Sequence, residues 1–181
     1  MIRPLLPVKS REEFAQDAAR QARGVTLAAI FDWALAAFLL ALLIATIVLR
    51  GVTSQQAAAA AVLALIGVPS LLLIAEGLRR AREVARVLQM GLSSIILFAN
   101  GAGVLRDLRD LLQGEINPST NLPSLLAGIF IVYGLTRRQT IAWFTTVSPA
   151  EALRHHDRRW LQRVALIGTA IGVLAVFINI G

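Results

Sequence analysis

The stretch 25-VTLAAIFDWALAAFLLALLIATIVL-49 decides the fold class. It contains a single charged residue, Asp32, in 25 residues. About 20 consecutive apolar residues are enough for a helix to cross the hydrocarbon core of a bilayer. Helical rise puts Asp32 roughly 12 Å inside the segment. The sequence therefore predicts a transmembrane helix at about 24–49 with a carboxyl group within it.

Composition and the spacing of charges extend this prediction to the whole chain. Of its 181 residues, 56% are hydrophobic and 16% are charged, and the mean hydropathy is +0.67. Soluble domains carry about 25% charged residues. The charges here cluster between long apolar segments, of which four more can be marked: about 57–78, 87–105, 122–135 and 164–180. We expect an all-α polytopic integral membrane protein in which 1–181 form a single transmembrane helical domain of about five spans.

The distribution of Lys and Arg predicts the orientation. In a five-span chain, 15 of the 18 basic residues fall on one side, and the other three are Arg50, Arg106 and Arg109. Cytoplasmic loops collect Lys and Arg, so we expect the N-terminus in the cytoplasm and the C-terminus outside. A re-entrant fourth segment is the alternative and would put the C-terminus inside. In the five-span arrangement, Arg137 and Arg138 mark the cytoplasmic end of the fourth span. Trp143, Phe144 and Trp160 are further anchors at the membrane interface.

Local patterns predict where some helices begin and end. The stretches 10-SREE-13 and 148-SPAE-151 both fit a capping box, and Pro149 occupies a favourable first helical position. We therefore expect the first and fifth helices to begin near Arg11 and Pro149 and to continue unbroken into their spans. The stretch 105-LRDLRDLLQG-114 predicts an amphipathic continuation of the third helix over about 105–113, ended by Gly114.

Three polar residues within apolar segments form a possible intramembrane site: Asp32, Glu76 and Asn100. An ionisable group inside a span is a functional hypothesis by default. Asp32 is either protonated, paired with an arginine or lining a polar path. We favour structural ion pairing of Asp32 and Glu76 with the arginines of the second connection, which include Arg79 and Arg80, and keep a cation or proton site as the alternative.

Small residues predict close helix packing at Gly101, Gly103, Gly168 and Gly172. The last two form a GxxxG pair, which serves contacts within the chain or with a neighbouring subunit. The only histidines, His155 and His156, are adjacent, so they point about 100° apart on a helix and do not form a two-ligand face. We expect both to be solvated.

No motif points to an enzyme. The chain has no cysteine, no HExxH, no phosphate-binding loop and no GxSxG. We therefore expect no catalytic residue, no cofactor, no metal and no bound nucleic acid. The partners we expect are the lipid bilayer and other membrane protein subunits or further copies of the chain. The predicted function is a non-enzymatic subunit or accessory (assembly) factor of a larger membrane complex. The alternative is a small transporter or substrate-capturing component.

Two stretches, 77-GLRRAREVARVLQ-89 and 133-YGLTRRQTIAWF-144, carry a resemblance to a protein group. The matching positions are Gly77, Leu78, Arg79, Ala85, Arg86, Tyr133, Leu135, Arg137 and Phe144. With these motifs the chain resembles small multi-spanning bacterial membrane proteins of no known function, which often have Pro where this chain has Arg138. The resemblance implies a membrane topology and no activity. The use of 17 arginines against one lysine suggests a GC-rich bacterial genome, so we expect a multi-pass protein of a bacterial cytoplasmic (inner) membrane.

Overall fold

The computed structural model describes residues 23–113 and 121–180, and every regular element in these ranges is a helix. The helices are α2 (Arg23–Arg50), α3 (Gln55–Arg79), α4 (Glu83–Leu112), α5 (Asn121–Thr136), α6 (Arg138–Thr146), α7 (Pro149–His155) and α8 (Arg158–Ile180). The predicted all-α class is confirmed for this part of the chain. Helices α2, α3, α4 and α8 are long and apolar enough to cross a membrane, and α5 is a shorter apolar helix. The chain is a multi-pass membrane protein.

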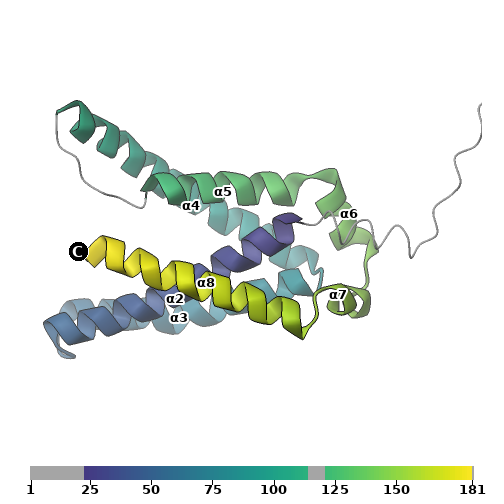
Figure 1. Ribbon diagram of the computed structural model, residues 1–181, viewed down its shortest axis with the longest axis horizontal. Helices are drawn as coiled ribbons and strands as arrows, with labels where there is room; N and C mark the ends of the chain where they lie inside the picture. Colours follow the sequence, from purple (N-terminus) through teal and green to yellow (C-terminus); the bar gives the residue numbers. More distant parts are fainter. Residues whose placement is uncertain (1–22, 114–120, 181) are drawn as a thin grey trace, which may run out of the picture.

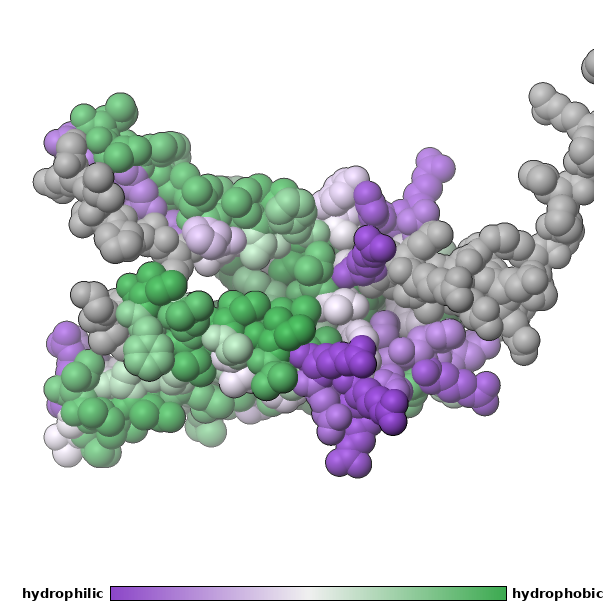
Figure 2. All heavy atoms as spheres, in the orientation of Figure 1, coloured by the Kyte–Doolittle hydropathy of each residue, from purple (hydrophilic) through white to green (hydrophobic). Residues whose placement is uncertain are grey.

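The helices form two arms that meet at one end (Figure 1). One arm contains α2, α3 and α8, and the other is the α4–α5 hairpin. Helices α2, α4 and α8 begin at the shared end, α3 and α5 finish there, and α6 and α7 lie across it. Hydrophilic side chains gather over this end, whereas the arms are largely hydrophobic (Figure 2). We call it the arginine-rich end, because most of the described arginines belong to these helix termini and to α6 and α7.

Helix α2 is the centre of the packing because glycines let other helices reach its backbone. A Cβ built on Gly168 would lie 2.5 Å from the Cβ of Trp33, so α8 lies directly on α2. A Cβ on Gly24 would lie 2.5 Å from the carbonyl carbon of Gly134, which brings α5 equally close to α2. This second contact is not predictable from the sequence, because each glycine is isolated in its own apolar segment.

The other predicted packing glycines lie between α4 and α5. A Cβ on Gly103 would lie 2.5 Å from the side chain of Asn121, so α5 begins directly against α4. Gly101 is less restricted, since the nearest side-chain atom to its virtual Cβ is a methyl group of Leu125 at 3.9 Å.

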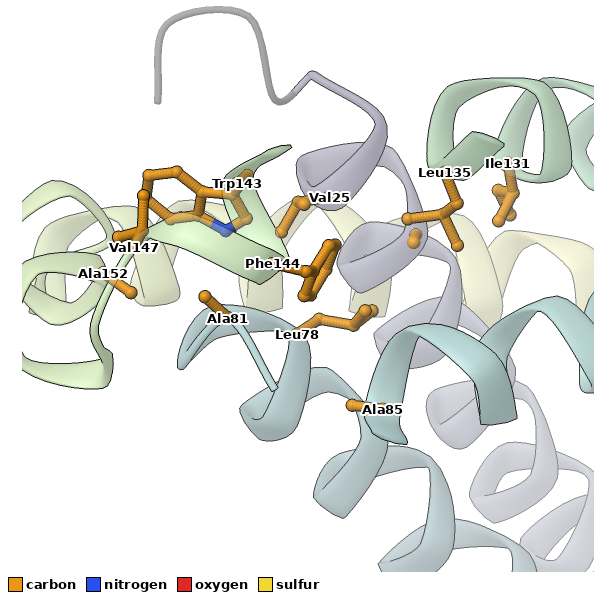
Figure 3. Close-up of a cluster of buried hydrophobic side chains, with 11 residues drawn as sticks. Val25, Leu78, Ala81, Ala85, Ile131, Leu135, Trp143, Phe144, Val147 and Ala152 are labelled. Atoms are coloured by element: carbon orange, nitrogen blue, oxygen red, sulfur yellow. The ribbon is translucent and has the colours of Figure 1, made fainter. Parts of the chain in front are cut away.

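An apolar cluster fills the arginine-rich end (Figure 3). Its members are Val25, Ala28, Leu78, Ala81, Ala85, Ile131, Leu135, Trp143, Phe144, Val147 and Ala152. Trp143 is completely buried and Phe144 is 6% exposed, so the prediction that they are interfacial anchors is wrong. The chain breaks at Arg137, and the separate helix α6 turns its apolar face toward the bundle rather than toward lipid headgroups.

The turn between α3 and α4 is unusually tight. The Arg82 amide donates to the Gly77 carbonyl at 2.9 Å, and the Ala81 amide donates to the Leu78 carbonyl at 3.1 Å. This is the hydrogen-bond pattern of a Schellman motif, which usually has glycine at the left-handed position. Ala81 adopts that conformation instead, with φ of 53°. Its methyl group belongs to the apolar cluster, and this contact offsets part of the conformational cost.

The ends of several helices test the sequence predictions. The capping box at Ser148–Glu151 is confirmed, with hydrogen bonds in both directions. The predicted unbroken helix from Pro149 is wrong, because α7 ends at His155 and the Asp157 carboxylate caps the start of α8 by accepting from the Trp160 amide at 2.8 Å. Helix α4 runs on through Leu112. The capping box at 10–13, the helix start near Arg11 and the stop at Gly114 lie outside the described residues.

Candidate functional site

Three polar side chains are fully buried in α2 and α4: Asp32 from α2, and Gln89 and Ser93 from α4, of which Gln89 approaches Asp32 between the two arms. We call them the buried polar site. Asp32 lies on the alanine-rich face of α2 that packs into the protein. Gln89 and Ser93 are four residues apart, so they lie one turn from each other on the same face of α4. Since α4 belongs to the second arm, the site is assembled only where the two arms come together.

The hydrogen-bonding atoms of this site have no partners among the described residues. Gln89 is the polar side chain that approaches Asp32. Nevertheless, both Asp32 carboxylate oxygens, both Gln89 amide atoms and the Ser93 hydroxyl lack a hydrogen bond within 3.5 Å. Burying such groups without partners costs free energy, about 1–3 kcal/mol for each neutral group and more for a charge. The site therefore contains several groups that can form strong hydrogen bonds, and all of them are buried away from the protein surface.

The chemistry of these groups suits a proton or a hard cation. The two Asp32 carboxylate oxygens and the Gln89 amide oxygen are oxygen ligands, which hard cations prefer over nitrogen or sulfur, and the Ser93 hydroxyl lies one turn farther along α4. A single carboxylate balances one positive charge. A proton on Asp32 would achieve the same neutrality and would supply a donor for the Gln89 amide oxygen.

The favoured ion pairing with arginines is correct for Glu76 and wrong for Asp32. The Glu76 carboxylate accepts from Arg79 Nε at 2.6 Å and from Arg80 Nε at 2.5 Å. Asp32 forms no ion pair with any described residue. The reason is depth: the arginines lie at the helix termini, whereas Asp32 lies more than two turns inside α2. The structure therefore separates Asp32 and Glu76 into two different environments.

Asn100 lies outside the buried polar site. Its side-chain nitrogen donates to the Ile96 carbonyl of the same helix at 2.8 Å. It lines a largely apolar lateral groove of about 520 Å³ between the arms, together with Phe31, Leu35 and Ile171 among others. We refer to this as the lateral groove. A hollow between the arms is visible in the space-filling view (Figure 2).

Sequence reasoning missed Gln89, although it carried a usable signal. Gln89 and Ser93 are polar residues four apart within the apolar stretch that includes Leu88 and Leu92. That spacing puts both on one helix face. Nothing in the sequence, however, indicates that this face meets Asp32 of α2.

A second group of buried polar side chains lies at the arginine-rich end. His156 is 5% exposed, and its ring stacks on Trp160 with 4.3 Å between centroids and lies 5.2 Å from Trp143. The expectation that both histidines are solvated is therefore wrong for His156, whereas His155 is exposed. Burial lowers the pKa of His156 to about 4, and a backbone hydrogen bond at Arg79 opposes part of this shift. Arg79 also holds this segment, since Nη1 donates to the His156 carbonyl at 3.0 Å.

The remaining predicted anchors differ in their surroundings. Trp160 is only partly exposed, and its indole nitrogen donates to the Thr26 hydroxyl at 3.3 Å, which ties α8 to α2. Arg137 is exposed and donates to the Tyr133 hydroxyl at 3.0 Å, with its guanidinium over the Tyr133 ring. Arg138 is exposed as well.

Within residues 23–113 and 121–180 there is no group of three or more His, Cys, Asp or Glu side chains that could hold a metal ion. No protein-family model matches the chain, and no curated protein or solved structure is significantly similar to it. The buried polar site is therefore the feature from which we infer the function.

Proposed function

We propose that the protein is a non-enzymatic membrane protein of the transporter class, and that its buried polar site binds a proton or a monovalent cation such as Na⁺. One observation supports this above all others. Asp32, Gln89 and Ser93 are fully buried, and their hydrogen-bonding atoms are unmatched by the described residues. Ionisable groups in membrane spans are costly and typically mark ion or proton pathways.

The division of the site between two arms suggests how access is controlled. Asp32 belongs to the α2–α3–α8 arm, and Gln89 and Ser93 belong to the α4–α5 hairpin. A small displacement of the hairpin relative to α2 therefore changes the hydration of the Asp32 carboxyl group and the number of its oxygen neighbours. In this mechanism the arginine-rich end holds the arms together, and the lateral groove lies on the side where they diverge.

We further propose five spans in a bacterial inner membrane, with the N-terminus in the cytoplasm and the C-terminus outside. The gathering of the arginines at one end of the bundle supports this through the positive-inside rule. Helix α5 has 16 residues and rises about 24 Å. Since the hydrocarbon core is about 30 Å thick, local thinning beside α5 accommodates the difference.

Carbodiimide labelling of the purified protein in liposomes tests the role of Asp32. A hydrophobic carbodiimide reacts with protonated carboxyl groups in apolar surroundings, so we expect mass spectrometry to find the adduct on Asp32. Na⁺ should protect the site if the cation binds there. In the same liposomes Asp32→Asn should abolish proton or Na⁺ flux, whereas the matched control Asp110→Asn should retain it. Unlabelled Asp32 together with flux that survives Asp32→Asn would overturn the proposal.

A second candidate function is a subunit or accessory factor of a larger membrane complex. The separation of the arms favours it, because the lateral groove offers a largely apolar surface that a transmembrane helix of another subunit would cover. Native mass spectrometry of protein released gently from its own membranes tests this candidate. Recovery in a stoichiometric complex, with function surviving Asp32→Asn, would favour the subunit over the transporter.

A further inference from the structure

We infer that the groove between α3 and α4 is a binding site for an anionic phospholipid, with Arg82 and Arg80 at its mouth and an apolar floor for an acyl chain. This groove has a volume of about 780 Å³, which lies within the range of about 300–1,000 Å³ typical of small-molecule sites. We call it the α3–α4 groove. It is independent of the buried polar site and of the function proposed for it.

The groove owes its shape to the tight turn that joins the two helices. At the turn α3 and α4 are in contact, since a Cβ built on Gly77 would lie 2.5 Å from the Cβ of Ala85. From there α3 continues into one arm and α4 into the other, so the helices diverge (Figure 1). A wedge-shaped space results, narrow at the arginine-rich end and open toward the surrounding bilayer.

The floor of the groove is suited to hydrocarbon. Leu73 and Ile74 contribute from α3, and Val84 and Leu88 from α4. Three of these side chains, Leu73, Val84 and Leu88, are more than half exposed in the protein alone. The polar residue farthest from the turn, Ser70, already donates its hydroxyl proton to the Ile66 carbonyl at 2.7 Å. The interior therefore favours an acyl chain over a polar solute.

The mouth of the groove has an excess of positive charge. Glu76 is the acidic residue that lines it, and this carboxylate is shared between Arg79 and Arg80. Arg82 is exposed and forms no ion pair with a described residue, because the neighbouring Glu83 pairs with Arg86 instead. In the lining of the groove, the single carboxylate of Glu76 thus stands against the two guanidinium groups of Arg80 and Arg82. Basic pockets between transmembrane helices recognise anionic lipid headgroups by this charge complementarity.

A lipid-binding measurement on the full chain tests the inference. The delipidated protein in detergent is titrated with phosphatidylglycerol, and with phosphatidylcholine of the same acyl chains, and bound lipid is counted by native mass spectrometry. We expect preferential binding of phosphatidylglycerol. Arg82→Gln should lower that affinity about fivefold, as expected for one basic residue at a membrane surface. The matched control is Arg138→Gln, which removes an equally exposed charge at the same end of the bundle but outside the groove.

A second variant and a competitor separate the headgroup from the acyl chain. Leu88→Trp fills the floor without changing any charge and should also weaken phosphatidylglycerol binding. Inorganic phosphate at millimolar concentration should not displace the lipid. Equal losses in Arg82→Gln and Arg138→Gln, undiminished binding in Leu88→Trp, or full displacement by phosphate would each overturn the assignment. An unchanged melting temperature without lipid verifies that each variant is folded.

Discussion

Gly172 of α8 packs directly on the backbone of Ala34 in α2, with no room for a Cβ between it and the Ala34 carbonyl oxygen. Phe38 and Ala37 close the contact on either side, at 2.9 Å from the position a Cβ would take. The GxxxG pair of α8 therefore serves packing within the chain. A bulky residue at this position would therefore disrupt the contact between α2 and α8 within the chain, whether or not the protein binds other subunits.

Gly172→Ala should lower the free energy of unfolding by about 1–3 kcal/mol, because the added methyl group overpacks the α2–α8 contact. The matched control is Gly91→Ala, since no atom lies within 4 Å of a Cβ at Gly91. In the middle of α4 this control should stabilise the protein by about 0.5–1 kcal/mol. Thermal or denaturant unfolding in one detergent measures both. Equal effects of the two substitutions would contradict the close contact.

Asp32→Asn should leave the melting temperature unchanged or raise it, because it removes a carboxyl group that is buried without an ion pair. It should also abolish stabilisation by the bound cation. In the unsubstituted protein, stability should rise by about 1.4 kcal/mol for each tenfold increase in Na⁺ above its dissociation constant. The measurement is a melting series in NaCl against choline chloride at constant ionic strength.

Asp110→Asn is the control for this series and should keep the full Na⁺ response. If the unsubstituted protein responds equally to both salts, Na⁺ is not the occupant of the buried polar site. The proposal would then reduce to proton binding at Asp32.

His156 should make the protein less stable in acid. Its pKa in the folded state is about 4, below its ordinary value of 6.5. The unfolded chain therefore binds the extra proton between these values, so stability is fully present above pH 6.5 and falls by about 1.4 kcal/mol per pH unit as the pH drops toward 4. Unfolding measured across this window should display the slope.

His156→Phe should remove this pH dependence while keeping a ring to stack on Trp160. His155→Phe, at the neighbouring exposed position, should leave the slope intact. A slope that persists in His156→Phe would assign the acid sensitivity to another group.

Arg79→Gln should loosen the junction between α7 and α8. The Arg79 side chain is the described link between Glu76 of α3 and the His156 carbonyl, and it is largely buried. Arg80→Gln is the comparison, because Arg80 shares Glu76 but donates no hydrogen bond to His156. Hydrogen exchange followed by mass spectrometry should find faster exchange across 149–157 in Arg79→Gln alone. Equal exchange in both variants would contradict the link.

The all-helical class was predictable from the sequence because it depends on local properties. Long apolar runs require helices in a bilayer, since only intrahelical bonds satisfy the backbone there. The capping box at Ser148 is likewise local, with all its groups inside one turn. Charged residues at segment ends indicated where α2, α3 and α5 stop, whereas α4 continues past Arg106 and Arg109 to Leu112.

The errors arose where the outcome depends on contacts between distant segments. Trp143 lies in a short amphipathic stretch beside arginines, which is the composition of an interfacial anchor. Its burial depends on how the chain turns after Arg137 and on cluster members from distant segments, such as Val25 and Leu78. The same holds for Asp32, whose nearest polar neighbour, Gln89, lies on a different arm. Composition identified the carboxyl group but could not identify what faces it.

Because the buried polar site is divided between α2 and α4, it can be completed only after α4 has been synthesised. Helix α2 leaves the ribosome before α4, α5 and α8. At that stage Asp32 has neither Gln89 nor Ser93 beside it, and the surface that later receives Gly172 is still open. The insertion machinery must therefore keep this carboxyl group near water or neutral until α4 arrives. A chain that stalls after α3 would display an unshielded acid to the lipid.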